Sequence, residues 1–193
     1  MNKVERLNTK LVREADILLK DFGLLKTLSK YGTPIITGSY VLKLMTWRDL
    51  DIHIEVKKFD GHKFFELGKE IMSKLKPDRM HYRNELIMKD IRLPMGLYWG
   101  VYTKILSQDT WKIDIWAMDS NQTEVHERQF EDLKSKINKE NRITILTIKN
   151  LYHRHPEHRK KFTSMDIYNA VIKDNVKTIE EFSIWLAKNK GVL

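Results

Sequence analysis

The sequence contains no cysteine, which excludes disulfide bridges and metal sites built from thiolates. None of its apolar runs approaches the length of a membrane-spanning helix, and its N-terminus lacks the apolar core of a signal peptide. We therefore expect a cytoplasmic protein with no membrane partner. The 193 residues also contain no internal repeat, low-complexity tract or obvious linker. What remains is a globular chain that is long enough to bury a substantial core.

The charge of the chain is biased towards basic residues. It has 35 lysines and arginines against 26 aspartates and glutamates, which gives a formal net charge of +9. This excess favours an anionic partner, and either a nucleoside triphosphate or RNA meets that requirement. The basic residues are dispersed, without an arginine-rich tract interleaved with aromatic residues, so the charge alone does not choose between the two.

The stretch from residue 34 to residue 56 joins a tight turn to a strand that carries two acids. A short apolar run ends at Gly38-Ser39, and a helix that begins at this turn would point free backbone N–H groups towards an anion. The residues then alternate from residue 49 onwards, with apolar side chains on one face of a strand and polar ones on the other. Asp49 and Asp51 therefore project from the same face.

Two carboxylates in this arrangement suit a divalent metal. Mg²⁺ prefers hard oxygen ligands and usually takes one or two protein carboxylates together with phosphate oxygens. The alternative is an ordinary solvated strand with a polar face, which an isolated pair of acids would favour. A third acid, Asp114, lies between apolar neighbours in a second strand-like run, Trp111 to Trp116, and this context favours a metal site.

The combined pattern resembles that of the nucleotidyltransferase superfamily with the polymerase-beta-like fold. That family has an apolar residue, a Gly-Ser or Gly-Gly turn, a spacer, an Asp-apolar-Asp-apolar run and a third acid on a later strand. Gly38 and Ser39 match the turn, Asp49 and Asp51 match the acid pair, and Asp114 matches the third acid. The resemblance covers about residues 30 to 118. Thr37 departs from it, because the family usually has an apolar residue before the glycine.

The resemblance implies an enzyme that transfers a nucleoside monophosphate from a nucleoside triphosphate to a hydroxyl and releases pyrophosphate. Two Mg²⁺ ions held by Asp49 and Asp51 would clamp the reacting phosphate. Asp114 would bind the second ion or act as a general base. Ser39 and the N–H groups after Gly38 would hold the outer phosphates. These five residues are the predicted site.

The acceptor is less well defined by the sequence. In size and in its helical C-terminal part the chain resembles enzymes that modify small molecules such as aminoglycosides and lincosamides. The alternative is a toxin-like or minimal nucleotidyltransferase that acts on tRNA or on a protein, and a further alternative is a non-catalytic nucleotide-binding protein. Three clustered acids repel one another and argue against the last of these. The preferred base and the oligomeric state stay open.

The fold that we expect is α/β (α+β), with a small mixed sheet flanked by helices. We expect a catalytic core over residues 1–120 and a helical extension over 121–193. The core should hold a long helix over 3–30 that Gly23 breaks or caps, strands near 34–36, 50–56, 80–88, 97–106 and 111–118, and a crossover helix over 64–75. The extension should hold helices over 123–137, 141–152, about 163–172 and 178–188.

Two further segments have more than one interpretation. One is an apolar and largely aromatic set that suits either the core or the stacking of a nucleobase, namely Leu97, Tyr98, Trp99, Tyr102, Trp111 and Trp116. The other is the basic segment from His153 to Lys161, which suits either a solvated loop or a contact with a triphosphate or an acceptor. A zinc site at its histidines is disfavoured, because no cysteine or tight carboxylate set accompanies them.

Overall fold

The computed structural model describes residues 2–192. Contacts divide the chain into two compact units. The sheet unit consists of residues 12–43 and 48–131, and the helical unit consists of residues 2–11, 44–47 and 132–192. The predicted division at residue 120 stays a prediction, because a compact unit is not by itself evidence of a separate catalytic part. Among residues 2–192, no helix combines the length and the apolar character needed to cross a bilayer.

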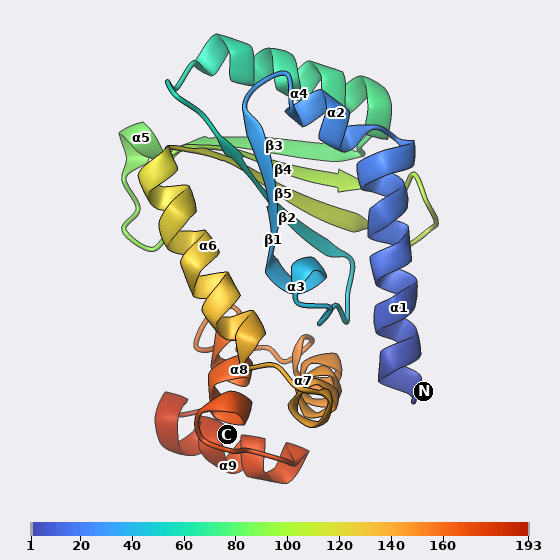
Figure 1. The fold of residues 1–193 in the computed structure, drawn as a ribbon, viewed down its shortest axis with the longest axis vertical. Helices are drawn as coiled ribbons and strands as arrows, with labels where there is room; N and C mark the ends of the chain where they lie inside the picture. The colour runs from blue at the N-terminus through green and yellow to red at the C-terminus, as the bar shows by residue number, and fades with distance from the viewer. Residues whose placement is uncertain (1, 193) are drawn as a thin grey trace. The chain divides into compact units, whose positions relative to one another are not determined.

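The sheet unit is built on five strands in the order β1-β2-β5-β4-β3. The strands are β1 (Thr33–Thr37), β2 (Asp49–Glu55), β3 (Arg79–Asn84), β4 (Leu97–Thr103) and β5 (Trp111–Met118). The central pair of β2 and β5 is parallel, whereas every other neighbouring pair is antiparallel. The predicted mixed sheet is therefore confirmed, and β3, β4 and β5 form the expected meander (Figure 1).

The N-terminal helical region is broken rather than continuous. Helix α1 (Lys3–Asp16) passes into one turn of π-helix, η1 (Ile17–Asp21), and α2 (Leu24–Leu28) follows. Gly23 adopts a left-handed conformation with φ of 66°, which glycine tolerates and most residues avoid. The prediction of a break at Gly23 is thus confirmed, and a single helix over 3–30 is wrong.

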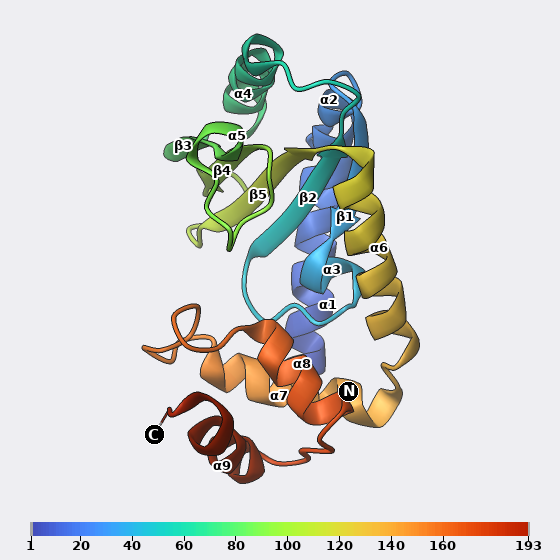
Figure 2. The ribbon, with the colours of Figure 1, turned by 90° about the vertical axis from the view of Figure 1, so that its left-hand side faces the viewer.

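One face of the sheet forms the apolar core of the sheet unit. Leu50, Ile52 and Ile54 of β2 lie beside Ile113 and Ile115 of β5, and all five side chains are fully buried. Helix α4 (Gly61–Leu75) packs on this face (Figures 1 and 2), where the Trp99 indole donates a hydrogen bond of 2.9 Å to the backbone oxygen of Phe64. The alternation along β2 therefore directs its acids to the opposite face.

Two predicted strand ends are wrong, and local side chains explain both. The strand expected over 80–88 ends at Asn84, because the Asn84 side chain accepts a hydrogen bond from the N–H of Leu86 and starts the short helix α5 (Glu85–Met88). The strand expected over 97–106 ends at Thr103, whose hydroxyl donates to the backbone oxygen of Leu75 at 2.6 Å.

The remaining helices match the predicted ones closely. They are α3 (Gly38–Val41) and α6 (Ser120–Ser135), followed by α7 (Lys139–Tyr152), α8 (Ser164–Ile172) and α9 (Ile179–Lys190), which pack together in the helical unit (Figure 2). Lys149 of α7 is 1% exposed, and its ammonium donates to the Leu44 backbone oxygen at 2.9 Å and to the Tyr168 hydroxyl at 2.8 Å. This lysine ties the segment before β2 to two helices of the same unit.

Candidate active site

The pairing of β2 with β5 sets the geometry of the predicted acids. In this parallel register Asp51 lies opposite Asp114, and Asp49 lies opposite Lys112. Positions two apart on a strand share a face, so Asp49, Asp51, Lys112 and Asp114 all project from the polar face of the sheet. The structure thus brings the third acid, which is distant in sequence, beside the acid pair.

Lys112 lies among these carboxylates. Its ammonium forms an ion pair with Oδ2 of Asp114 and lies 3.8 Å from Oδ1 of Asp49. The three side chains are only 22%, 15% and 12% exposed for Lys112, Asp114 and Asp49 respectively, so water screens the pairing weakly. The cation offsets part of the repulsion between acids that would otherwise be held close together.

Tyr98 of β4 is the second partner of Asp114. Its hydroxyl donates a hydrogen bond of 2.6 Å to Oδ1 of the carboxylate. Burial, followed by the charge of Asp114 and this hydrogen bond, raises the pKa of the phenol well above its usual value. The tyrosine is therefore a permanent donor near neutral pH.

A glycine makes room for this contact. Gly100 lies opposite Asp114 in the register of β4 with β5, and a Cβ atom at this position would lie 2.5 Å from the Tyr98 hydroxyl oxygen. Such an approach is closer than any real Cβ contact, so a side chain here would displace the phenol. The absence of a side chain at residue 100 thus lets Tyr98 reach along its own strand to Asp114.

The predicted phosphate turn lies next to Asp51. Thr37, the last residue of β1, pairs with Asp51, and Gly38 follows with φ of 68°. A Cβ atom on Gly38 would lie 2.2 Å from Oδ2 of Asp51, so both the backbone conformation and the close approach require glycine. Ser39 is half-buried in α3, which is a single turn, and its macrodipole is correspondingly small.

The side chains present fit Mg²⁺ in the manner of a two-carboxylate site. Asp49 and Asp51 supply hard oxygen atoms from one strand, and the glycine turn approaches one of them directly. Within residues 2–192, no three side chains of the His, Cys, Asp or Glu type are arranged to hold a metal ion together. Asp114 instead forms its ion pair with Lys112. The role of Asp114 as a metal ligand stays a prediction.

Helix α6 covers the β1 and β2 side of the polar face. The Thr123 hydroxyl donates to Glu55 at 2.8 Å, and the ring of His126 lies 5.1 Å from that of His53. His53 is 7% exposed, and burial, with a smaller contribution from His126, lowers its pKa to about 4. Burial also lowers the pKa of His126. Both rings are therefore neutral at physiological pH and serve packing.

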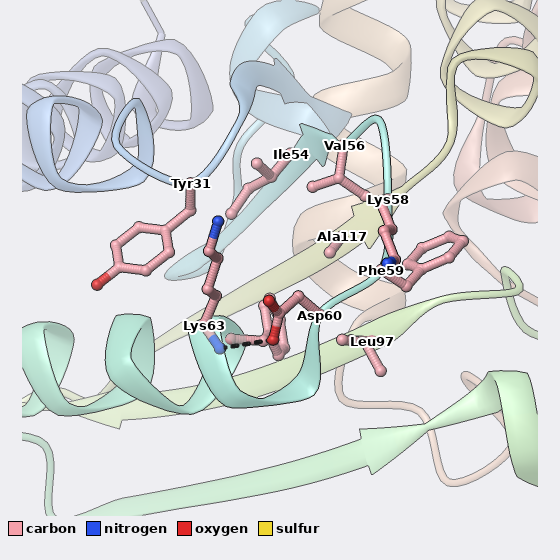
Figure 3. A pocket seen from close by; sticks show the side chains of 10 residues that line it. Tyr31, Ile54, Val56, Lys58, Phe59, Asp60, Lys63, Leu97 and Ala117 are labelled. Carbon is pink, nitrogen blue, oxygen red and sulfur yellow. Dashed lines mark hydrogen bonds between the residues drawn. The ribbon is translucent and has the colours of Figure 1, made fainter.

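A small cavity of about 40 Å³ lies on the other face of the sheet (Figure 3). Ile54 of β2 and Ala117 of β5, which pair with each other, line it from the strands. Asp60 and Lys63 line it at the start of α4. These strand positions point away from Asp51 and Asp114. The cavity is thus separate from the acids and too small for a nucleotide.

Sequence reasoning missed Lys112 and Gly100 and left Tyr98 between core and ligand. Strand alternation alone places Lys112 on the face of Asp114, so that signal was present in the sequence. The contact between Tyr98 and Asp114 depends on the register of two strands, which no short motif encodes.

No protein-family model matches the sequence, and a search of curated proteins finds no match. Solved structures do match. Cid1, described by its RNA terminal uridylyl transferase activity, has a TM-score of 0.60 at 13% identity, over 84% of this chain and 48% of that chain. A cytoplasmic RNA terminal U-transferase has a TM-score of 0.57 at 11% identity, over 88% of this chain and 51% of the other. The GLD-2/RNP-8 complex gives 0.53 at 15% identity, over 88% and 63%.

These neighbours belong to the nucleotidyltransferase superfamily, and Cid1 poly(U) polymerase has also been solved with Mg and 3′-dATP bound. The chain spans only about half to two thirds of the length of the structures it matches. At these identities the likeness establishes the fold. The chain therefore has the polymerase-beta-like nucleotidyltransferase fold that its glycine turn and acid pattern predict.

Proposed function

We propose that the protein is a Mg²⁺-dependent enzyme that transfers a nucleoside monophosphate from a nucleoside triphosphate to a hydroxyl. The observation that carries the proposal is the meeting of Gly38, Asp51 and Asp114 on one face of a sheet with this fold. The glycine lets the backbone that follows it approach the carboxylates closely, as a phosphate held beside a metal site requires. All five predicted site residues lie within the proposed catalytic core of residues 1–120, which the helical extension 121–193 would follow.

In the proposed reaction the acceptor oxygen forms a bond to the α-phosphorus, and the bond from that phosphorus to the oxygen bridging to the β-phosphate breaks. Pyrophosphate leaves with the bonding electrons. The proton of the acceptor hydroxyl passes to the Asp114 carboxylate and then to water. The backbone after Gly38 and the Ser39 hydroxyl hold the β- and γ-phosphates, which orients the triphosphate for in-line attack.

Asp49 and Asp51 are the carboxylates that would hold the metal. Mg²⁺, when bound, supplies positive charge that stabilises the phosphate oxygens during transfer, and two ions are expected. Lys112 lies between Asp49 and Asp114 and keeps the acids together in the absence of metal. The Tyr98 hydroxyl fixes the orientation of the Asp114 carboxylate through its hydrogen bond. The chain's own groups thus position phosphate, metal ligands and base from three neighbouring segments.

RNA is the acceptor that the comparisons support. Two of the matched structures are RNA terminal transferases by their descriptions, and the chain carries a net charge of +9, which favours a polyanion. A small-molecule acceptor of the aminoglycoside or lincosamide kind is the alternative that the size of the chain suggested. Aminoglycosides are polycations and gain no electrostatic attraction from a protein with a positive net charge. The net charge therefore favours RNA over aminoglycosides.

A transfer assay tests the function. Purified full-length protein is incubated with Mg²⁺, each of the four labelled nucleoside triphosphates, and a panel of acceptors comprising short RNA, bulk tRNA, aminoglycosides, lincosamides and cell lysate, and the products are identified by mass. We expect nucleotide addition and pyrophosphate release, both lost in Asp49→Asn and Asp51→Asn proteins that melt as cooperatively as the wild type. Failure of every acceptor, together with no Mg²⁺-dependent triphosphate binding, would show that the protein is a non-catalytic member of the fold.

A further inference from the structure

The polar face of the sheet continues beyond Asp114 as a row of rings. This ring row consists of Trp116 on β5, Tyr98 and Tyr102 on β4, and His81 on β3. Ring centroids lie 4.7 Å apart for Trp116 and Tyr98, 5.4 Å for Tyr98 and His81, and 5.9 Å for His81 and Tyr102, with the last pair stacked at 28°. The Trp116–Tyr98 and Tyr98–His81 pairs are tilted, by 38° and 58°, so the rings form a continuous aromatic surface in which His81 and Tyr102 are the nearly parallel pair.

The register places the ring row on the face of the acids. His81 pairs with Gly100, which in turn pairs with Asp114, so these three positions form one line across β3, β4 and β5. Neighbouring strands lie about 4.8 Å apart, which puts His81 about 10 Å from Asp114 across the sheet. Tyr102 pairs with Lys112 in the adjacent line. Tyr98, Tyr102 and His81 therefore lie on the side of Asp114 away from β2.

The ring row is accessible, although Tyr98 itself is buried. His81 is exposed, and Tyr102 and Trp116 are half-buried. Helix α4 packs on the opposite face of the sheet, and α6 contacts the far side of the polar face at His53 and Glu55. A planar group could thus approach His81 and Tyr102 without displacing an element of the sheet unit.

A cation stands at the end of the row. The Arg79 guanidinium lies 3.8 Å from the centroid of the Tyr102 ring and is exposed, and it forms no ion pair with any residue from 2 to 192. Arg83, on the same strand, instead forms an ion pair of 2.6 Å with Glu85, which is 1% exposed. Arg79 is therefore the arginine of this face that is available to an anion, and an arginine that is already stacked on a ring suits a phosphate beside a base.

Gly100 gives the row its shape. A Cβ atom at residue 100 would lie 2.6 Å from Cε1 of His81 as well as 2.5 Å from the Tyr98 hydroxyl. The Tyr98 and His81 rings therefore occupy the space that a side chain at residue 100 would need. The same glycine that lets Tyr98 reach Asp114 thus brings His81 into the row.

Resting on the function proposed above, we propose that the ring row binds the 3′-terminal nucleotides of an RNA acceptor. Bases stack on His81 and Tyr102, a backbone phosphate faces Arg79, and the terminal hydroxyl lies towards Asp114. Aromatic rings accept any base by stacking, while the arginine requires a negative charge. A polycationic aminoglycoside would place its ammonium groups against Arg79, so this arginine favours the nucleic acid at its end of the ring row.

Binding of RNA in the absence of triphosphate and metal tests this surface separately from catalysis. The probe is a 12-nucleotide single-stranded RNA with a fluorophore at its 5′ end, and the readout is fluorescence polarisation with the full-length protein. His81→Ala and Tyr102→Ala should each weaken binding by roughly tenfold, within the range for one stacked base. Arg79→Gln should weaken binding and reduce the slope of log affinity against log salt by about 0.7, the value for one phosphate contact on a single strand.

Two controls match these changes in residue type and exposure. Phe65→Ala removes a ring that is 51% exposed on α4, and Arg128→Gln removes an exposed arginine on α6, both away from the ring row. Neither control variant should change the RNA affinity or the salt slope as much as the ring-row variants do. Thermal melting of all five variants checks that they fold.

The outcomes separate the two proposals. Wild-type protein that transfers nucleotides to RNA, with His81→Ala and Tyr102→Ala proteins that bind RNA as tightly as the wild type, would overturn the ring row and leave the function standing. If the wild type binds RNA but transfers no nucleotide, and these variants lose RNA binding, the ring row would be supported as a binding surface and the proposed function overturned. A wild type that does not bind the RNA at all would overturn the proposal about the ring row.

Discussion

The Tyr98 hydroxyl donates a hydrogen bond of 2.6 Å to the Asp114 carboxylate from the neighbouring strand. One oxygen of Asp114 is thereby directed to Tyr98, and the other forms the ion pair with Lys112. A carboxylate fixed at both oxygens has little freedom to rotate, which is what a residue needs if it is to meet a reacting hydroxyl in one orientation. The contact also connects Asp114, the proposed general base, to the ring row.

We expect Tyr98→Phe to slow nucleotidyl transfer by roughly 10- to 100-fold, the range for the loss of a group that orients a metal ligand or base. The phenylalanine ring preserves the stacking surface, so RNA affinity should stay within about twofold of the wild type. Single-turnover kinetics measures the first quantity and polarisation measures the second.

Gly100→Ala is the companion change for this prediction. Its new methyl group would displace the Tyr98 hydroxyl and the His81 ring together, so both transfer and RNA affinity should fall. A Tyr98→Phe protein with the wild-type single-turnover rate would show that the hydrogen bond has no catalytic role.

Lys112→Met should strengthen Mg²⁺ binding. The Lys112 ammonium contacts Asp114 and lies 3.8 Å from Asp49, so it competes with a metal cation for these carboxylates. A unit charge about 4 Å away contributes about 4 kcal/mol at an effective dielectric constant of 20, and we therefore expect at least a roughly tenfold gain in affinity. Isothermal titration with Mg²⁺ measures it.

The metal-free Lys112→Met protein should also melt below the wild type, because the carboxylates lose a nearby cation, and Mg²⁺ should remove this difference in melting temperature. Lys104→Met is the matched control, since that lysine is 53% exposed and lies 4.0 Å from its acidic partner Asp78. Unchanged Mg²⁺ affinity in the Lys112→Met protein would contradict a metal site at Asp49 and Asp114.

Gly38→Ala should impair triphosphate binding by tenfold or more, because the added methyl group would meet Oδ2 of Asp51 at 2.2 Å. Part of any effect comes from backbone strain, since an L-residue at φ of 68° costs roughly 1–2 kcal/mol. Gly191→Ala isolates that part, because Gly191 has φ of 60° with open space around its Cβ position. Equal nucleotide affinity in the two variants would place the phosphates elsewhere.

The contact of the buried His53 ring with His126 predicts a loss of stability in mild acid. The folded-state pKa of His53 is about 4, against 6.5 for the free side chain. As the pH falls from about 6.5 to about 4, the unfolded chain binds a proton at this histidine and the folded chain does not, which favours unfolding. For His53 alone, the free energy of unfolding should fall by about 2 kcal/mol between pH 7 and pH 5.

The lowered pKa of His126 acts in the same direction. Urea unfolding at pH 7 and pH 5 measures the change. The free energy of unfolding of the His53→Gln protein should depend less on pH than that of the wild type. An identical dependence in the two proteins would mean that His53 titrates normally in the folded state.

Strand alternation was sufficient to predict the shared face of Asp49 and Asp51, because a period of two residues is a property of the backbone itself. The glycine turn and the mixed sheet were predicted from the motif and from the order of strand-like and helix-like segments. The register of β5 on β2 could not be predicted in this way. It depends on side-chain packing between segments far apart in sequence, and a shift of one residue would turn Asp114 into the apolar core.

The starts of α4 and α5 were not predicted, for local reasons. Asn84 and Asp60 each cap a helix through a side-chain oxygen, and the apolar stripe used to locate helices begins only after such caps. The single turn of α5 carries Leu86, Ile87 and Met88, which also suit a strand, and propensity could not separate the two.

The parallel pairing of β2 with β5 has a consequence for how the site assembles in time. Helix α4, β3, α5 and β4 all lie between the two strands in the chain, so the pairing that brings Asp51 and Asp114 together is a long-range contact. Such long-range pairings carry a large loop-closure entropy and form late. A cation that bridges the two strands should therefore slow unfolding of the native protein while leaving the rate of refolding unchanged.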